Sequence, residues 1–361
     1  MMEKTIGLSR DFIIHPGETL QEVLEDRNMS QKELAMRTGV SEKHVSKVIN
    51  GLASISVSFA KKLEYVLGID ASFWVNLQTN YNQELQEYEE VNKINKDELA
   101  IIKVISGIIE YFANTQRIEI PSSPQGLVIE ARRLLGVSNL TLIPKLSYQA
   151  AYRASVACEV DVYVLFAWQR ICELLAAQVD VHEKLDIEKL IKSIPEIKQV
   201  MFMDASHMQQ RLTEIFANCG VAFRIVKNFK GAPVHGFIER DKDGKNILCM
   251  TIRQAFADIF WFTLFHEIGH FINDDIKQRR FDFVIEDSEE EELANKFASD
   301  VLLNPSSYAD FVKANDFSLE AIKEFAKSQD VRNFIVIGRL QKEKILAYSE
   351  FSEEKIRYKW A

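Results

Sequence analysis

Two histidines and a glutamate in one apolar stretch have the spacing of a metal-dependent hydrolase. In the segment Phe260 to Asn273, FWFTLFHEIGHFIN, His266 and His270 lie four residues apart, and Glu267 follows the first of them. Side chains four apart on an α-helix share a face, so both imidazoles could bind one cation while Glu267 points beside it. The residues therefore predict a zinc site. The alternative is a chance coincidence among the seven histidines of the chain.

The sequence around these residues predicts a buried helix that would position them. Apolar side chains recur there at helical spacing, namely Phe256, Phe260, Leu264, Ile268 and Phe271 or Ile272. Unpartnered imidazoles on a buried helix are costly, and a metal ion is the obvious partner. Catalytic zinc takes three protein ligands and keeps one open position for water, so a third ligand is expected elsewhere in the chain.

An acidic run downstream offers carboxylates for that position. Glu286 to Glu292 leads into LANKFASDVLL, whose apolar residues recur at helical spacing, so a second helix is expected to begin within the run. Carboxylates also suit a helix N-terminus, and Ser288 and Glu291 have the spacing of a capping box. Composition alone leaves both interpretations open, a metal ligand or a helix start.

These two segments together resemble the ImmA/IrrE family of metallopeptidases. The resemblance lies in HEIGH followed downstream by E-x-x-A-N-x-F-A-x-x-x-L-L, and in the lead-in from Arg253 to Phe262. It implies a zincin-like fold in which a glutamate on the second helix completes the zinc site. By position that glutamate is Glu291, with Glu290 and Glu292 as alternatives in register.

The resemblance also implies a zinc-dependent peptidase mechanism. Zinc held by His266, His270 and Glu291 would lower the pKa of a bound water to about 7. Glu267 would take the proton of that water during attack on a peptide carbonyl. Asn295, four residues after Glu291, is expected to orient one of the ligands. An oxyanion donor is needed as well, and the sequence leaves it open. Its candidates, each with a structural or solvated alternative, are His207, His235 and Tyr308.

Two short helices joined by a tight turn are expected near the N-terminus. Ser30 and Ser41 have the type and position of N-caps for helices at Gln31 to Thr38 and Glu42 to Asn50. Gly39 would supply the left-handed turn that lets the second helix leave at a steep angle. The pattern predicts a helix-turn-helix.

The outward face of the second helix is polar and would meet DNA. Residues in its N-terminal half would reach base edges in the major groove, and Gln31 would reach a phosphate. The alternative is a helical interaction module whose polar face is only solvated. The candidate DNA-contacting residues are Gln31, Ser41, Glu42, Lys43, His44, Ser46, Lys47 and Asn50.

This N-terminal segment resembles HigA-type antitoxins of the XRE family, with a lambda-repressor-like helix-turn-helix. The resemblance rests on His15-Pro16-Gly17-Glu18 and on Phe73-Trp74-x-x-Leu77-Gln78-x-x-Tyr81. It implies a transcriptional regulator that binds operator DNA as a homodimer and, where a toxin gene is adjacent, binds the cognate toxin. Acidic and basic residues nearly balance in residues 1–70, so DNA affinity is expected to depend on dimerisation.

Composition is that of an ordinary globular protein. The chain has 361 residues, of which 47% are hydrophobic and 27% charged, enough for two or three domains. No apolar run approaches membrane length and no signal-peptide core begins the chain, so a cytoplasmic protein without a membrane partner is expected. A net charge of −9 argues against broad coating of nucleic acid, though not against a local DNA-reading surface. The scattered cysteines, predicted to be reduced core residues, are Cys158, Cys172, Cys219 and Cys249.

The expected fold is mainly α, with a C-terminal α+β domain. VAFRIV at 221–226 is a strand candidate, and residues 235–252 have the pattern of a hairpin, which gives a small sheet beside the HEIGH helix. The expected domains are a helix-turn-helix domain at 15–85, a helical middle region at 86–198 and a metallopeptidase domain at 199–361.

Two functions from different classes follow. The first is a DNA-binding regulator with a working zinc peptidase that cleaves a repressor, a toxin or itself. The second is a HigA-like antitoxin and autorepressor whose peptidase-like domain is non-catalytic and only binds a partner.

Overall fold

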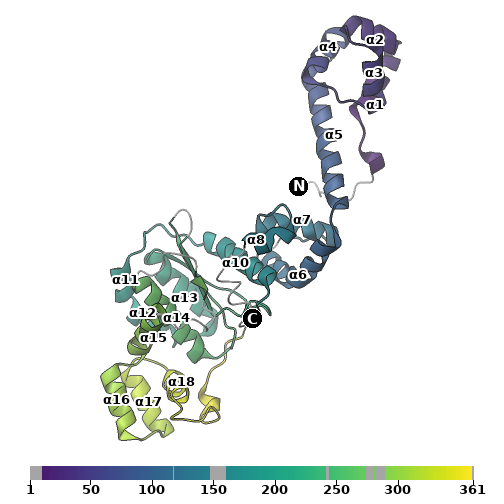
Figure 1. Ribbon diagram of the computed structural model, residues 1–361. Coiled ribbons are helices and arrows are strands. Elements are labelled where there is room, and N and C mark those ends of the chain that lie inside the picture. Colours follow the sequence, from purple (N-terminus) through teal and green to yellow (C-terminus); the bar gives the residue numbers. More distant parts are fainter. Residues whose placement is uncertain are drawn as a thin grey trace. The chain divides into compact units, whose positions relative to one another are not determined.

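The computed structural model describes residues 10–116, 118–146, 160–240, 244–273, 280–281 and 289–359 (Figure 1). The chain divides into two compact units. The first comprises Met1–Ile102 with Ile120–Arg132, and the second comprises Lys103–Glu119 with Arg133–Ala361. The boundaries expected at residues 85 and 198 both fall inside helices.

The first unit is built from helices around an apolar core. Helices α1 to α5 contribute that core, in which Leu34 and Val45 of the expected helix pair are fully buried beside Trp74. The elements are η1 (Arg10–Phe12), α1 (Pro16–Asp26), α2 (Gln31–Thr38), α3 (Glu42–Ile49), α4 (Val57–Leu67) and α5 (Ala71–Asn92).

Local capping determines where α2 and α3 begin. Ser30 Oγ accepts from the Glu33 N–H at 3.1 Å, and Ser41 Oγ accepts from the His44 N–H at 3.1 Å. Each bond satisfies a backbone donor that the helix itself leaves unpaired. Gly39 follows α2 with φ 65°, the left-handed conformation expected of it. The helix-turn-helix predicted from the sequence is therefore confirmed.

The polar stretch after Tyr81 continues α5 to Asn92. The next helix, α6 (Lys96–Gln116), contributes to both units. Within the first unit, the buried Glu98 carboxylate accepts two hydrogen bonds from Arg132 of α7 (Pro124–Leu135), at 2.9 and 2.6 Å. This bidentate pair satisfies the charge of Glu98 in the interior.

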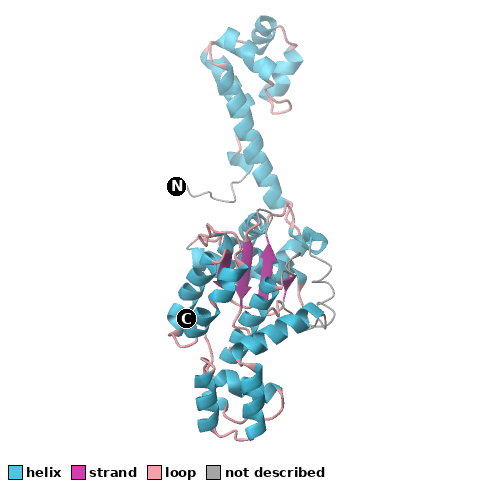
Figure 2. Cartoon of the chain, turned by 90° about the vertical axis from the view of Figure 1, so that its left-hand side faces the viewer, coloured by secondary structure: helices cyan, strands magenta, loops and turns pink. Residues whose placement is uncertain are grey.

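The second unit is organised around a four-stranded sheet, counted over the described residues (Figure 2). The strand order is β1-β3-β2-β4, for β1 (Val221–Ile225), β2 (Gly236–Arg240), β3 (Asn246–Met250) and β4 (Arg280–Phe281). β1 is parallel to β3, and β2 is antiparallel to β3 and β4. The predicted strand and hairpin are thus present, although residues 241–243 of the hairpin turn lie outside the described residues.

Helices pack on both faces of this sheet. On one face, α10 (Val162–Ala177) contacts β2 and β3, with Trp168 against Phe237 and Cys249 donating to the Cys172 carbonyl. On the other face, α13 (Ala205–Asn218) and α14 (Ala257–Ile272) share an apolar core with the sheet. Phe216 of α13 stacks on Phe223 of β1 at 5.0 Å between ring centroids.

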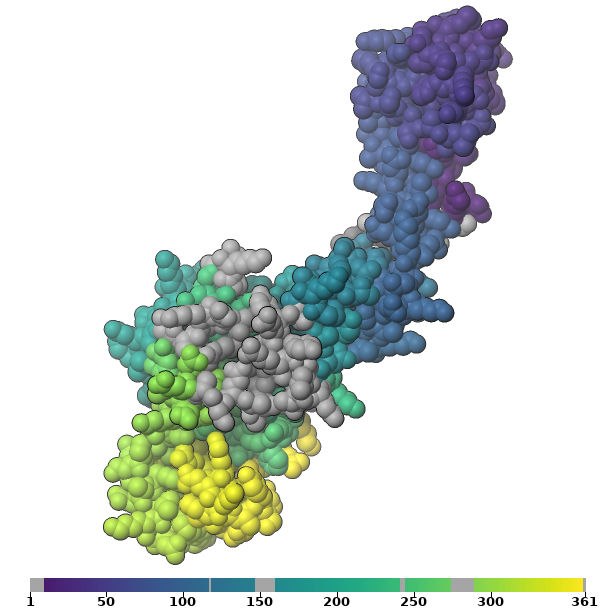
Figure 3. All heavy atoms as spheres, in the orientation of Figure 1, coloured from purple at the N-terminus to yellow at the C-terminus, as the bar shows by residue number. Residues whose placement is uncertain are grey.

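The second unit contains further helices. Those at the C-terminal end form one part of its surface, green to yellow in Figure 3. They are η2 (Leu140–Leu142), α8 (Ile143–Leu146), α11 (Ile187–Lys192), α12 (Ile194–Val200), α15 (Glu289–Leu302), α16 (Pro305–Ala314), α17 (Leu319–Ser328), α18 (Asn333–Lys342) and η3 (Ser352–Glu354).

Three cysteines are buried free thiols, as predicted: Cys172, Cys219 and Cys249. Cys158 lies outside the described residues. None of the described helices is long and apolar enough to cross a membrane.

Candidate metal centre and nucleic-acid interface

The HEIGH segment lies on α14, a helix buried on nearly every side. His266, Glu267 and His270 are 5%, 2% and 2% exposed, as the apolar flanks predicted. Phe256, expected within the helix, is its N-cap residue in an extended conformation. Its backbone bridges to Arg357 of the C-terminal segment, which explains why the helix begins one residue later.

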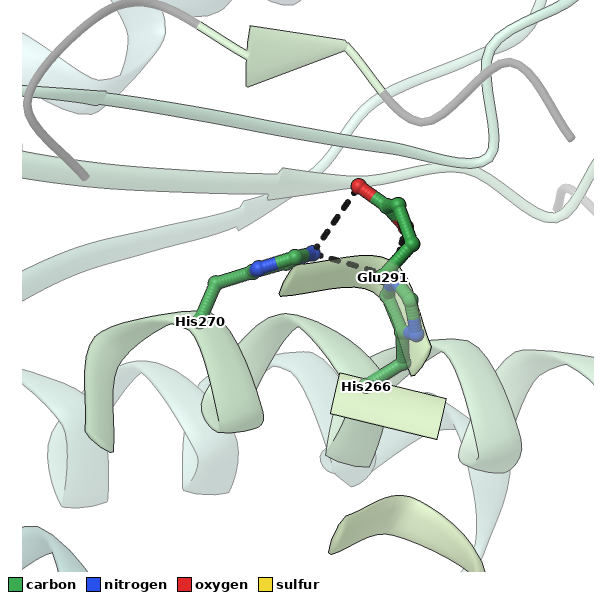
Figure 4. Close-up of side chains that lie close together, drawn as sticks. All are labelled: His266, His270 and Glu291. Atoms are coloured by element: carbon green, nitrogen blue, oxygen red, sulfur yellow. Dashed lines mark hydrogen bonds and ion pairs between the residues drawn. The ribbon is translucent and has the colours of Figure 1, made fainter. Parts of the chain in front are cut away.

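The metal-ligand candidates of α14 meet one carboxylate of α15. His266 Nε2 lies 3.0 Å from His270 Nε2, and the Glu291 carboxylate lies 3.0 Å from His266 Nε2 and 3.5 Å from His270 Nε2 (Figure 4). In the described part of the chain, these residues form the one group of histidine and acidic side chains that could hold a metal ion, with donor atoms within 4.8 Å of one another. Glu290 and Glu292 are outside that group.

Two helices approach closely to make this convergence possible. Gly269 of α14 lies against Ala294 of α15, and a Cβ at residue 269 would be 3.0 Å from the Ala294 Cα. The small side chains let the two backbones come together one turn from His266. The spacing of α14 and α15 therefore fixes which glutamate reaches the histidines.

Asn295 orients one imidazole. His266 Nδ1 lies 3.1 Å from Asn295 Oδ1, an oxygen that can accept a proton from that nitrogen, and its Nε2 faces His270 and Glu291. Burial by itself raises the pKa of the Glu291 carboxyl, but the hydrogen bonds and charges of the two histidines outweigh it and hold that pKa well below its usual range. The three side chains thus present a carboxylate and two ring nitrogens to one point.

The Glu267 carboxylate lies against the sheet. A Cβ built on Gly236, the first residue of β2, would lie 2.0 Å from Glu267 Oε1. The missing side chain at Gly236 therefore makes room for the carboxylate. Sequence reasoning missed this role, although an isolated glycine in a strand is a known signal of close approach.

The candidates for an oxyanion donor lie in different places. His207 is exposed and contacts Ser206 at 3.2 Å. The Tyr308 hydroxyl donates to Glu343 at 2.8 Å, so its proton is directed at α18 rather than at the metal-ligand trio. His235 is buried, precedes Gly236 in the chain and has its Nε2 3.5 Å from Arg253 Nη1. Of the three candidates, His235 is therefore the one next in sequence to Gly236, the strand residue that packs against Glu267.

The polar face of α3 carries the candidate DNA contacts. Exposed residues on it are Ser41, Glu42, Lys43, Lys47 and Asn50, whereas His44, Ser46 and Gln31 of α2 are half-buried. The His44 ring packs edge-on against Phe59 at 5.0 Å, and the Asn50 amide donates to the Ser46 carbonyl at 2.7 Å. The two lysines are the cations that α3 presents to solvent.

His15 helps to position α1 against α3, a role that sequence reasoning did not assign. Its Nδ1 accepts from the Gly17 N–H at 2.9 Å, which caps α1, and its ring lies 4.6 Å from the Tyr81 ring. A Cβ on Gly17 would lie 2.0 Å from the Val48 carbonyl of α3, so α1 meets the end of α3 at that glycine. These contacts explain the His15-Pro16-Gly17 pattern in physical terms.

Comparisons with known proteins concern this N-terminal segment. A family model described as Helix-turn-helix, HTH_3, matches residues 20–74. The uncharacterized HTH-type transcriptional regulator YddM of Escherichia coli (strain K12) is 28% identical over 82 residues, 22% of this chain and 87% of that protein. Virulence-associated protein I of Dichelobacter nodosus is 32% identical over 77 residues, 21% of this chain and 71% of that protein.

Solved structures include two similar proteins. An addiction module antidote protein of the HigA family from Coxiella burnetii is 33% identical, over 22% of this chain and 89% of that one, with a TM-score of 0.21. The Pseudomonas aeruginosa antitoxin HigA, solved with the higBA promoter, is 30% identical over 23% of this chain and 96% of that one, with a TM-score of 0.22.

Proposed function

Since residues 20–74 make this chain a member of the helix-turn-helix family, we propose that it is a DNA-binding transcriptional regulator whose C-terminal unit is a zinc-dependent peptidase. The regulator would bind operator DNA as a homodimer, because paired half-sites mirror a two-fold protein. Its peptidase would cleave a repressor, a toxin or the chain itself.

One observation carries the peptidase part, namely the convergence of His266, His270 and Glu291 from two helices. Ligand atoms about 2.0–2.2 Å from a zinc ion at tetrahedral angles lie about 3.3–3.6 Å apart. The separations here are 3.0 and 3.5 Å between Glu291 and the two rings, and 3.0 Å between the rings. The donor set and its spacing therefore fit zinc with one position left for water or substrate.

The roles of the residues follow from their chemistry. A zinc ion in this position would lower the pKa of water to about 7 and polarise a peptide carbonyl. Glu267 contributes no ligand atom to the trio, and we assign its carboxylate the role of accepting a proton from the attacking water and returning it to the leaving amine nitrogen. Asn295 holds the His266 tautomer that presents a lone pair.

Metal content is the first test of this proposal. Elemental mass spectrometry of the purified full chain is expected to find near one zinc per chain, and His270→Ala and Glu291→Ala are each expected to lose it. Glu267→Gln, which leaves the trio intact, is the matched control and should retain zinc while losing proteolysis. An absence of zinc in the fresh protein, with none taken up on titration, would refute the peptidase proposal.

DNA binding is tested separately on promoter DNA of the protein's own locus. Lys43→Ala and Lys47→Ala should each weaken DNA binding. Each should also reduce the slope of the logarithm of the binding constant against the logarithm of salt concentration by about one for each phosphate that is no longer neutralised. Lys93→Ala, which removes the same charge near the end of α5, is the control. Parent-like binding and salt slope in both α3 variants would remove α3 from the DNA interface.

A second candidate function is an antitoxin and autorepressor whose peptidase-like unit only binds a partner. The HigA-like pattern from His15 to Tyr81 favours it. In that case zinc and Glu267 would be dispensable, and a small toxin encoded beside the gene would co-purify with the chain. Failure of such a toxin to bind would count against this second function and leave the first untouched.

A further inference from the structure

A cavity of about 540 Å³ lies in the C-terminal part of the second unit and is lined by none of the metal-ligand trio. Four segments form its walls: the end of α12, one face of α17, the turn into α18, and η3. Its volume is within the range of about 300–1,000 Å³ that is usual for small-molecule sites.

The cavity is rich in cations. Lys323 and Lys327 project from one face of α17, and Arg332 lies at the start of α18. One of the two acidic residues of the lining, Glu354, is already paired. Glu354 pairs with Lys323 at 3.1 Å and accepts from the Asn333 amide at 2.6 Å. The charges of Lys327 and Arg332 therefore remain to attract an anion.

The other acidic residue of the lining, Asp330, lies near Lys198, a cation outside the lining. Burial lowers the pKa of Lys198, and the negative charge of Asp330 partly opposes this shift, so the two charges interact. The Lys198 ammonium also donates to the neighbouring Gln329 carbonyl at 3.0 Å. With Asp330 and Glu354 both counted, the three cations Lys323, Lys327 and Arg332 still leave the lining with one net positive charge.

Arg332 combines a buried donor with an aromatic neighbour. Its guanidinium carbon lies 5.6 Å from the ring centroid of Phe202, whose side chain is 46% exposed. Its Nε is buried and has no hydrogen-bond acceptor among the residues that the structure describes. Arg332 is also the N-cap residue of α18, and its side chain makes no capping bond. Arg332 lines the cavity, and a phosphate oxygen is a strong acceptor for a guanidinium group.

We propose that this cavity binds a phosphorylated nucleoside, with its phosphate between Lys327 and Arg332 and its base against Phe202. Arginine and lysine are the usual phosphate partners, and an exposed aromatic ring stacks on any base. The site is separate from the metal-ligand trio and does not depend on the proposed peptidase.

The test is calorimetric titration of the full chain with AMP, inorganic phosphate and adenosine at one salt concentration. AMP should bind more tightly than phosphate or adenosine. Lys327→Met, a surface change that leaves the fold intact, should weaken AMP binding about tenfold or more, as the loss of one charge-assisted hydrogen bond does. Phe202→Ala should weaken AMP binding and leave phosphate binding unchanged.

Lys313→Met, an exposed lysine on α16 outside the lining, is the matched control and should bind AMP like the parent. AMP binding that survives both Lys327→Met and Arg332→Gln would overturn the site. No binding of AMP, ADP or ATP at millimolar concentration would overturn the ligand class. Equal binding of AMP and phosphate would overturn the role of Phe202.

Discussion

Replacing Gly236 by alanine would force a methyl group onto the Glu267 carboxylate. The new Cβ would lie 2.0 Å from Oε1, 2.7 Å from Cδ and 3.0 Å from Cγ of Glu267. Favourable separations are about 3.5–4.0 Å, so the carboxylate or strand β2 must move by roughly 1 Å or more. Both are buried, and a packed interior gives way only at a cost.

The expected cost is that of an overpacked core, about 1–3 kcal/mol in the free energy of unfolding. Urea unfolding of the full chain, followed by tryptophan fluorescence, measures it. Zinc content is expected to stay at the parent level, because Glu267 lies outside the metal-ligand trio. Gly107→Ala is the control, since a Cβ there meets nothing within 4 Å and alanine stabilises a helix by about 0.5–1 kcal/mol.

A double-mutant cycle identifies the contact responsible. Glu267→Ala removes all three atoms that the new methyl group would strike, so Gly236→Ala should cost far less in that background. The coupling free energy is expected to be in the range of about 0.5–3 kcal/mol. An equal cost of Gly236→Ala in both backgrounds would show that Gly236 is not there to accommodate Glu267.

Three further predictions concern single side chains. Burial lowers the pKa of His15, so its contribution to stability is complete above about pH 6.5 and is lost as pH falls through the lower folded pKa. His15→Asn, which keeps a capping acceptor without titrating, should flatten the change in urea midpoint between pH 7.5 and 5.5; a slope as steep as the parent's would show that His15 does not cause it. Asn295→Ala should weaken zinc binding about 10–100-fold in a chelator competition, whereas Asn295→Asp should preserve it. Parent affinity in the alanine variant would mean that His266 needs no orienting partner. Ser41→Ala should cost about 1 kcal/mol through loss of the α3 cap, and an unchanged urea midpoint would contradict that role.

Several features of the fold could be predicted from short stretches of sequence, because the interactions that cause them join residues close together in the chain. Ser30, Gly39 and Ser41 bond or bend the backbone within a few residues of themselves, and the limits of α2 and α3 follow. His266 and His270 likewise lie on the same face of their helix because they are four residues, about one turn, apart. Where a helix end depended on a distant segment, as at Phe256 and its bridge to Arg357, the helix began one residue after Phe256.

The sequence by itself therefore determined the helix-turn-helix, the two histidines on one helical face, and the neighbouring carboxylate. Tertiary structure alone decided that Glu291, and not Glu290 or Glu292, meets the histidines, because the approach of Gly269 to Ala294 sets the register of α15 against α14. It also decided that Gly236 accommodates Glu267, and that four separate segments line an open, cationic cavity. Such contacts join residues far apart in the chain, and no local spacing encodes the packing that brings them together.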